Sequence, residues 1–184
     1  MTRNTIRITF AAAWLFVATL PNSGLATPDF DAAAERHETA TIADRRHLHE
    51  FPELSGREFN TQAYLRERLT EMEGIELIEG DWGTGLVAIL RGAEPGPLIA
   101  WRADIDGLPI TETTGLPFAS TQRDTLSGGR NVGVMHACGH DMHMAVWRST
   151  ARFLAERRDL WAGTLVMIAQ PAEEIGAGAR AMIA

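Results

Sequence analysis

The stretch of this chain with the clearest chemical potential is residues 136–143, HACGHDMH, which holds three of the six histidines and the only cysteine. A thiolate at Cys138 and an imidazole at His140 can face one point only if the backbone between them bends, and Gly139 gives that freedom. These ligand types favour Zn²⁺, Mn²⁺, Co²⁺ or Ni²⁺ over Ca²⁺ or Mg²⁺, which prefer oxygen ligands. The alternative is a buried structural cysteine beside incidental surface histidines.

Carboxylates follow two predicted strands. The segment 102–104, which ends in Asp104, comes directly after an apolar run at 98–101, and the segment 170–174, which ends in Glu173 and Glu174, follows another at 164–169. Ligands bind beyond the carboxyl ends of parallel strands, so we expect these groups on the same rim as the 136–143 loop. Adjacent carboxylates point different ways, so one can bind a metal while the other faces a substrate, as metal-assisted hydrolysis requires. The alternative is a solvated acidic pair at a helix N-terminus.

The elements that must position these groups follow from apolar spacing. Ser55 and Glu58 have the Ser-x-x-Glu form of a capping box, which predicts that a helix begins there. Uninterrupted apolar strands between helices indicate an α/β fold with a largely parallel sheet and helices on both faces. We expect helices over about 31–50, from 55 onward and over about 141–158, and buried strands over 86–90, 98–101 and 164–169, the first two strands being adjacent.

Composition limits the class of protein. With 184 residues, 45% of them hydrophobic, the chain can bury one core of ordinary size. The formal net charge is -7 and the arginines are scattered, which argues against a nucleic-acid partner. We therefore expect one domain without a nucleic-acid partner.

The first 26 residues have the pattern of a secretory signal peptide, which leaves 27–184 as the domain. Arg3 and Arg7 precede an apolar run at 8–20, and small residues follow it. That run is shorter than the roughly 20 residues that span a bilayer, so a retained membrane anchor is the weaker alternative. The sequence thus predicts a periplasmic or secreted protein with no stable membrane anchor.

Three blocks in order carry a family resemblance: residues 102–109 (RADIDGLP), 135–141 (MHACGHD), and 170–174 (QPAEE) followed by GAGA at 176–179. They resemble the signature blocks of the M20 metallopeptidase family. The form CGHD is similar to its amidohydrolase branch, which includes hippurate hydrolases, N-acyl-amino-acid amidohydrolases and auxin-conjugate hydrolases. The similarity runs from about residue 40 to the end of the chain.

The resemblance implies a role for each matching residue. Cys138, His140 and Glu174 would be metal ligands, with Cys138 able to bridge two divalent transition ions. Glu173 would be the general base and acid. The cofactor would thus be a pair of Zn, Mn, Co or Ni ions in the full site.

Three other residues have less direct parts in this picture. Asp104 would be the carboxylate that orients His140, as metal-bound histidines usually require, or else only a strand-end hydrogen-bond acceptor. His136 and His143 match family positions that are not usual ligands, which favours packing or hydrogen bonding over coordination.

As a whole, the resemblance implies a zinc-peptidase-like catalytic domain that cleaves the amide bond of an N-acyl amino acid or similar small conjugate with a metal-activated water. Family chains are about twice as long, with two more histidine ligands and a lid or dimerisation domain, and the full form allows a homodimer. We therefore expect an incomplete N-terminal portion, inactive alone. One alternative is a catalytically inactive metal-binding or interaction fragment. Another is a thiol hydrolase with Cys138 as nucleophile and His140 or His143 as base.

Overall fold

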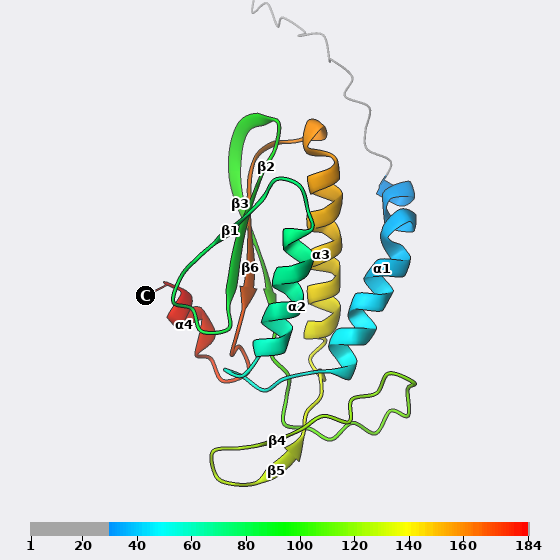
Figure 1. Ribbon diagram of the computed structural model, residues 1–184, viewed down its shortest axis with the longest axis vertical. Coiled ribbons are helices and arrows are strands. Elements are labelled where there is room, and N and C mark those ends of the chain that lie inside the picture. The colour runs from blue at the N-terminus through cyan, green and yellow to red at the C-terminus, as the bar shows by residue number, and fades with distance from the viewer. Residues whose placement is uncertain (1–29, 184) are drawn as a thin grey trace, which may run out of the picture.

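The computed structural model describes residues 30–183 (Figure 1). The predicted signal peptide, residues 1–26, lies outside the described residues. No helix in the described range is both long and apolar enough to cross a membrane. The elements in chain order are α1 (Phe30–Glu50), α2 (Phe59–Thr70), β1 (Ile75–Ile78), β2 (Leu86–Arg91), β3 (Glu94–Asp104), β4 (Arg123–Thr125), β5 (Asn131–Gly133), α3 (His140–Glu156), a 3₁₀ turn (Arg158–Leu160), β6 (Ala162–Gln170) and α4 (Gly178–Ile183).

The main sheet has the strand order β1-β2-β6-β3. The α/β class is confirmed, but the sheet is mixed rather than largely parallel. Only β3 and β6 pair parallel, whereas β1 with β2 and β2 with β6 pair antiparallel. The reason lies in the connections: the chain passes through α3 between β3 and β6, which permits a parallel return, while a short link joins β1 to β2.

The predicted strands 86–90 and 98–101 both form, but they are not neighbours, because β6 lies between them. β3 is an edge strand of the described sheet. Its apolar run is largely exposed, with Leu98 at 69% and Ile99 at 60% of full exposure. An apolar run therefore identified the strand without revealing its position in the sheet or what covers it.

The long helices lie on one face of the sheet, so within the described residues only the short α4 lies on the other side, where helices on both faces were expected. In Figure 1, α2 and α3 pack against the sheet and α1 lies outside them, while the short α4 lies on the other side of the lower end. The core between them contains Leu65, Leu90, Met144 and Met167. At its centre is Trp147, whose buried ring nitrogen donates to the backbone oxygen of Trp101 at 3.2 Å.

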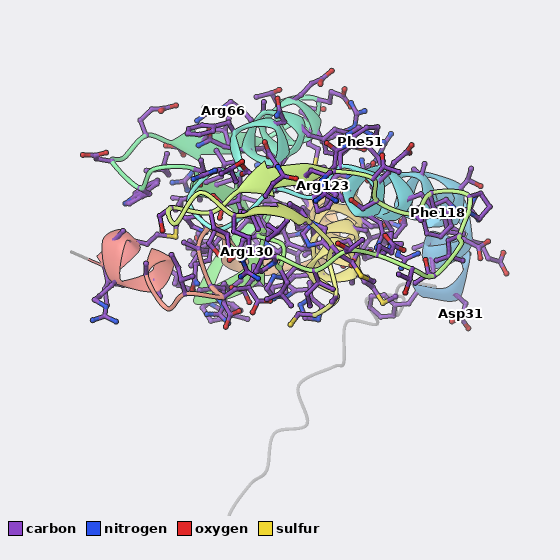
Figure 2. All side chains as sticks on the ribbon, turned by 90° about the horizontal axis from the view of Figure 1, so that it is seen from below. Asp31, Phe51, Arg66, Phe118, Arg123 and Arg130 are labelled. Atoms are coloured by element: carbon purple, nitrogen blue, oxygen red, sulfur yellow. The ribbon has the colours of Figure 1, made fainter. Side chains whose placement is uncertain are left out.

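The lower end of Figure 1 is where β6, and β3 parallel to it, have their carboxyl ends. The β4–β5 hairpin lies beyond this same end, and Figure 2, which looks onto it, labels Arg123 and Arg130 of the hairpin. An ion pair of 2.6 Å between Arg57 and Asp124 joins the hairpin to the loop before α2.

The predicted capping box does not form. α2 begins after Glu58 with no capping hydrogen bond from that side chain. Instead, the carboxylate of Glu53 accepts hydrogen bonds from the backbone N–H groups of Asn60 (3.1 Å) and Thr61 (2.7 Å). Because Glu53 satisfies these donors of the first turn, Ser55 and Glu58 are free to bond elsewhere.

Candidate metal centre

The predicted site residues converge beyond the carboxyl ends of β3 and β6. The loop that leads into α3 turns at Gly139, whose φ of 84° is left-handed, and α3 begins immediately after this residue. After this turn, Cys138 is exposed and His140 is buried. The side chains brought together are those of Asp104 at the end of β3 and Asp106 just after it, Cys138 before α3 and His140 at its start, and Glu173 and Glu174 after β6.

The distances centre on the imidazole of His140. Its Nε2 atom lies 3.7 Å from an oxygen of Glu173 and 4.0 Å from an oxygen of Glu174. One ligand-type atom from each of Asp104, His140 and Glu173 lies within 4.8 Å of the others. The thiol of Cys138 lies close enough to Glu174 for that side chain to raise its pKa. The fold thus brings Asp104, His140 and Glu173 into one cluster, with Glu174 against His140 and Cys138 near Glu174, as the strand-end argument expected.

Asp106 is a member of this cluster that sequence reasoning did not assign. It is fully buried, and its Oδ1 atom lies 3.5 Å from Nδ1 of His140. The same Nδ1 lies 2.8 Å from the backbone oxygen of Asp106, so it carries a hydrogen and donates there, leaving Nε2 toward Glu173 and Glu174. The contact that orients His140 was expected from Asp104, and the structure shows it for Asp106 instead. Its position two residues after Asp104 was the available signal.

The pKa values show how strongly these charges interact. Burial alone would lower the pKa of His140, but its hydrogen bonds to Asp106 outweigh burial and raise the pKa to about 9. Burial would raise the pKa of Asp106, yet the nearby imidazole of His140 and the hydrogen bond from Ser55 hold it at about 2. Burial raises the pKa of Asp104. The hydrogen bond to Glu174 raises the pKa of the Cys138 thiol to about 11. The cluster therefore favours the protonated forms of His140, Asp104 and Cys138.

The donor set fits a divalent transition ion. Buried oxygens of Asp104, Asp106 and Glu174 have no hydrogen-bond partner. Unpaired buried oxygens beside an imidazole and a thiol are an arrangement that a cation would satisfy, in exchange for the protons on His140 and Cys138. Among the residues the structure describes, this is where carboxylate, imidazole and thiol donors meet.

A hollow of about 450 Å³ adjoins the centre at Cys138. His136 lines it, is buried, and has neither ring nitrogen hydrogen-bonded, while burial lowers its pKa to about 4. On another wall, His49 joins Asp141 (2.8 Å) to Glu112 (3.1 Å). The other lining residues include Arg45, Thr114, Leu116, Met135, Met142 and His143.

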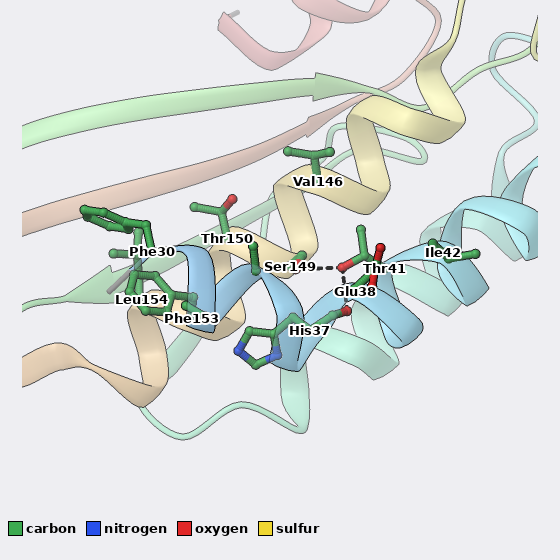
Figure 3. A pocket seen from close by; sticks show the side chains of 12 residues that line it. Phe30, His37, Glu38, Thr41, Ile42, Val146, Ser149, Thr150, Phe153 and Leu154 are labelled. Carbon is green, nitrogen blue, oxygen red and sulfur yellow. Dashed lines mark hydrogen bonds between the residues drawn. The ribbon is translucent and has the colours of Figure 1, made fainter. Parts of the chain in front are cut away.

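A second hollow, of about 460 Å³, lies between α1 and α3 (Figure 3). A hydrogen bond of 2.8 Å from Thr41 to Ser149 crosses its floor, and Phe30, Ile42 and Val146 contribute apolar surface. None of the predicted site residues lines this hollow.

An α/β domain with thiol, imidazole and carboxylate donors beyond its strand ends is the arrangement of a metal-dependent hydrolase. Comparison with known proteins agrees, because residues 100–184 match the model of peptidase family M20/M25/M40. The chain belongs to the M20 family.

Relatives extend this result. The chain is 46% identical over 146 residues to an N-acetyl-L-cysteine deacetylase of Bacillus subtilis, covering 79% of this chain and 33% of the relative. It is 43% identical to an N-acetyldiaminopimelate deacetylase of Oceanobacillus iheyensis, covering 76% and 34%. The solved YXEP protein of Bacillus subtilis, a dinuclear metal binding peptidase from the M20 family, aligns with a TM-score of 0.72 at 46% identity, covering 81% of this chain and 39% of that one. The chain thus spans about a third of the length of the curated relatives it matches.

Proposed function

We propose that these residues belong to a metal-dependent amidohydrolase that removes the acyl group from a small N-acyl amino acid. The observation that carries this proposal is the convergence of Glu173 and Glu174 on Nε2 of His140, beside the thiol of Cys138. The names of the relatives, deacetylases of acetylated amino acids, support the substrate class. Since the chain spans a third of their length, the activity is proposed for the whole protein.

Cys138, His140 and Glu174 would hold the metal, with the unpaired oxygen of Asp104 beside them. A bound divalent ion would polarise the acyl carbonyl and lower the pKa of a water molecule. Two ions are proposed because the aligned YXEP protein is dinuclear.

The different exposure of the two glutamate side chains supports different roles for them. The side chain of Glu173 is 39% exposed and that of Glu174 is 15% exposed. The more accessible carboxylate of Glu173 can take a proton from water and return it to the leaving amine, while the more buried one remains to bind the metal. The hollow of about 450 Å³ beside Cys138 is large enough for a small substrate, and Leu116, Met135 and Met142 give it apolar walls.

We also propose that the protein is exported, because residues 1–26 have the pattern of a signal peptide. The N-terminal sequence of the protein recovered from its native cells tests this. A mature chain that begins near residue 27 supports export, and a chain that retains residues 1–26 contradicts it.

The activity is tested by incubating the whole protein with hippurate and N-acetyl amino acids while Mn²⁺, Zn²⁺, Co²⁺ or Ni²⁺ is removed and returned. We expect a chelator to abolish hydrolysis and added metal to restore it. A thiol hydrolase would instead keep its activity in chelator and lose it on alkylation of Cys138. An inactive metal-binding module would bind the ion and hydrolyse nothing.

A further inference from the structure

The loop before α2 is hydrogen-bonded to the turn that carries the two glutamates of the metal centre. The backbone N–H of Ala172 donates to the carboxylate of Glu58 at 2.8 Å, across 114 positions of sequence. Glu58 is fully buried. The sequence suggested that this residue caps α2, but the helix is capped by Glu53 instead. Its burial therefore needs another explanation.

Ala172 has an unusual backbone conformation. Its φ of 48° makes it the one residue other than glycine with a positive φ in the described chain. This region is unfavourable for a residue with a β-carbon, and it persists only where surrounding contacts hold it. Ala172 immediately precedes Glu173, so its conformation sets the direction in which both glutamates leave the end of β6.

The surroundings of Glu58 consist of hydrogen-bond donors. Besides Ala172, the N–H of Gly56 donates at 2.9 Å and the hydroxyl of Thr84 at 2.5 Å. A carboxylate can accept all three bonds, which offsets the cost of burying its charge. The bond to Ala172 is the one that connects this arrangement to the metal centre.

A second contact holds the other side of Glu173. The hydroxyl of Ser55 donates to Oδ2 of Asp106 at 2.6 Å, and the same oxygen accepts the backbone N–H of Glu174 at 3.0 Å. The loop at 55–58 thus fixes the backbone both before and after Glu173.

From these contacts we infer that Glu58 is a positioning residue: by holding Ala172 at a positive φ, it aims Glu173 and Glu174 at the metal centre. The inference about aiming rests on the proposed function. The underlying contact between Glu58 and Ala172 does not, so the two can be tested separately.

The first measurement is amide hydrogen exchange at Ala172 in the metal-free full chain. We expect strong protection in the parent and in Glu58→Gln, whose amide oxygen can still accept this N–H. Protection should be lost in Glu58→Ala and in Glu58→Asp, which keeps the charge but is too short to reach. Equal protection in the parent and Glu58→Asp would overturn the inference. Glu58→Asp also serves if Glu58→Ala does not fold.

The second measurement is the affinity of each variant for Zn²⁺. Glu58→Ala and Glu58→Asp should bind about 10-fold or more weakly, as for loss of a group that orients a ligand. Adding Ala172→Gly should restore much of the affinity, because glycine adopts a positive φ without strain. The matched control is Ala177→Gly, an exposed alanine in the same turn, which should restore nothing.

The outcomes separate the two proposals. If the parent binds no metal, the proposed function fails, and hydrogen exchange still decides whether Glu58 holds Ala172. If the parent binds metal but Ala172→Gly rescues no better than Ala177→Gly, the positioning inference is wrong and the proposed function stands. In the active whole protein, Glu58→Asp should lower kcat with little change in KM, and Ala172→Gly should recover kcat.

Discussion

The carboxylate of Asp106 and the imidazole of His140 face each other with 3.5 Å between Oδ1 and Nδ1, both side chains being buried. This pairing raises the pKa of His140 to about 9, and the hydrogen bond from Nδ1 to the backbone oxygen of Asp106 fixes which ring nitrogen faces Glu173 and Glu174. A buried carboxylate beside the imidazole of a metal-binding histidine usually helps to orient that ligand.

Asp106→Asn should therefore weaken metal binding by about 10- to 100-fold, the usual cost of losing such a partner. In the metal-free chain the pKa of His140 should fall from about 9, because the amide does not stabilise the imidazolium. Metal titration and an NMR titration of His140 measure the two effects. Asp124→Asn, on the hairpin, is the control and should change neither. An unchanged pKa in Asp106→Asn would contradict the pairing.

Metal binding itself should depend on Cys138 and His140. Cys138→Ser and His140→Ala should each lower the bound Zn²⁺ or Mn²⁺ measured by equilibrium dialysis, since a thiolate or imidazole donor is lost. His143→Ala is the comparison, because His143 is exposed and the sequence does not favour it as a ligand. If the first two variants bind as much metal as the parent, the assignment of the centre is wrong.

In the active whole protein, substitutions at the two adjacent glutamates should have different effects. Glu173→Gln should lower kcat by about 10²-fold or more with metal content intact, because it removes a proton acceptor and keeps the size of the side chain. Glu174→Gln should instead reduce metal content. Steady-state kinetics and elemental analysis on the same samples check both, and the reverse pattern would exchange the two roles.

The edge of β3 should make the isolated residues 27–184 associate, because the described sheet pairs β3 only with β6 and leaves Leu98 and Ile99 exposed. Ile99→Lys should shift the chain toward monomer in analytical ultracentrifugation, since a charged edge discourages strand pairing. Val146→Lys makes a similar change at the groove between α1 and α3 and should leave association intact. If Val146→Lys alone gives monomers, the groove is the contact surface.

Alkaline pH should destabilise the chain through its one tyrosine, Tyr64. Burial, followed by the hydrogen bond to Asp44, raises its pKa to about 12 from an ordinary value of 10.0. Below pH 10 the hydroxyl is protonated in both folded and unfolded chains, and its contribution to stability is complete. Between pH 10 and 12 the unfolded chain releases this proton while the folded chain retains it, so stability falls.

The free energy of unfolding of the metal-free parent and of Tyr64→Phe should therefore differ by a constant amount below pH 10 and converge above it. Tyrosinate absorbance reports the folded pKa directly, because no other tyrosine contributes. A pKa of Tyr64 in the folded chain at its ordinary value of 10.0 would contradict the prediction.

The sequence alone determined what chemistry is available and where most elements lie. Cys138, His140, Glu173 and Glu174 are unusual in type and spacing, and the apolar runs predicted α1, α3, β2 and β6 because local periodicity reflects local burial. The positions of Asp104 and of the glutamate pair just after predicted strands were enough to place them at one end of the sheet.

Only the tertiary structure decided which strands are neighbours and which residues are hydrogen-bond partners. Strand order depends on crossovers and on long-range pairing, which an apolar run does not encode, so the position of β6 between β2 and β3 could not be predicted. Ser55 and Glu58 matched a local capping pattern, but partners far along the chain, Asp106 and Ala172, compete for the same side chains. They prevail because Glu53 supplies the cap and because buried N–H and O–H groups must be paired wherever the fold brings them together.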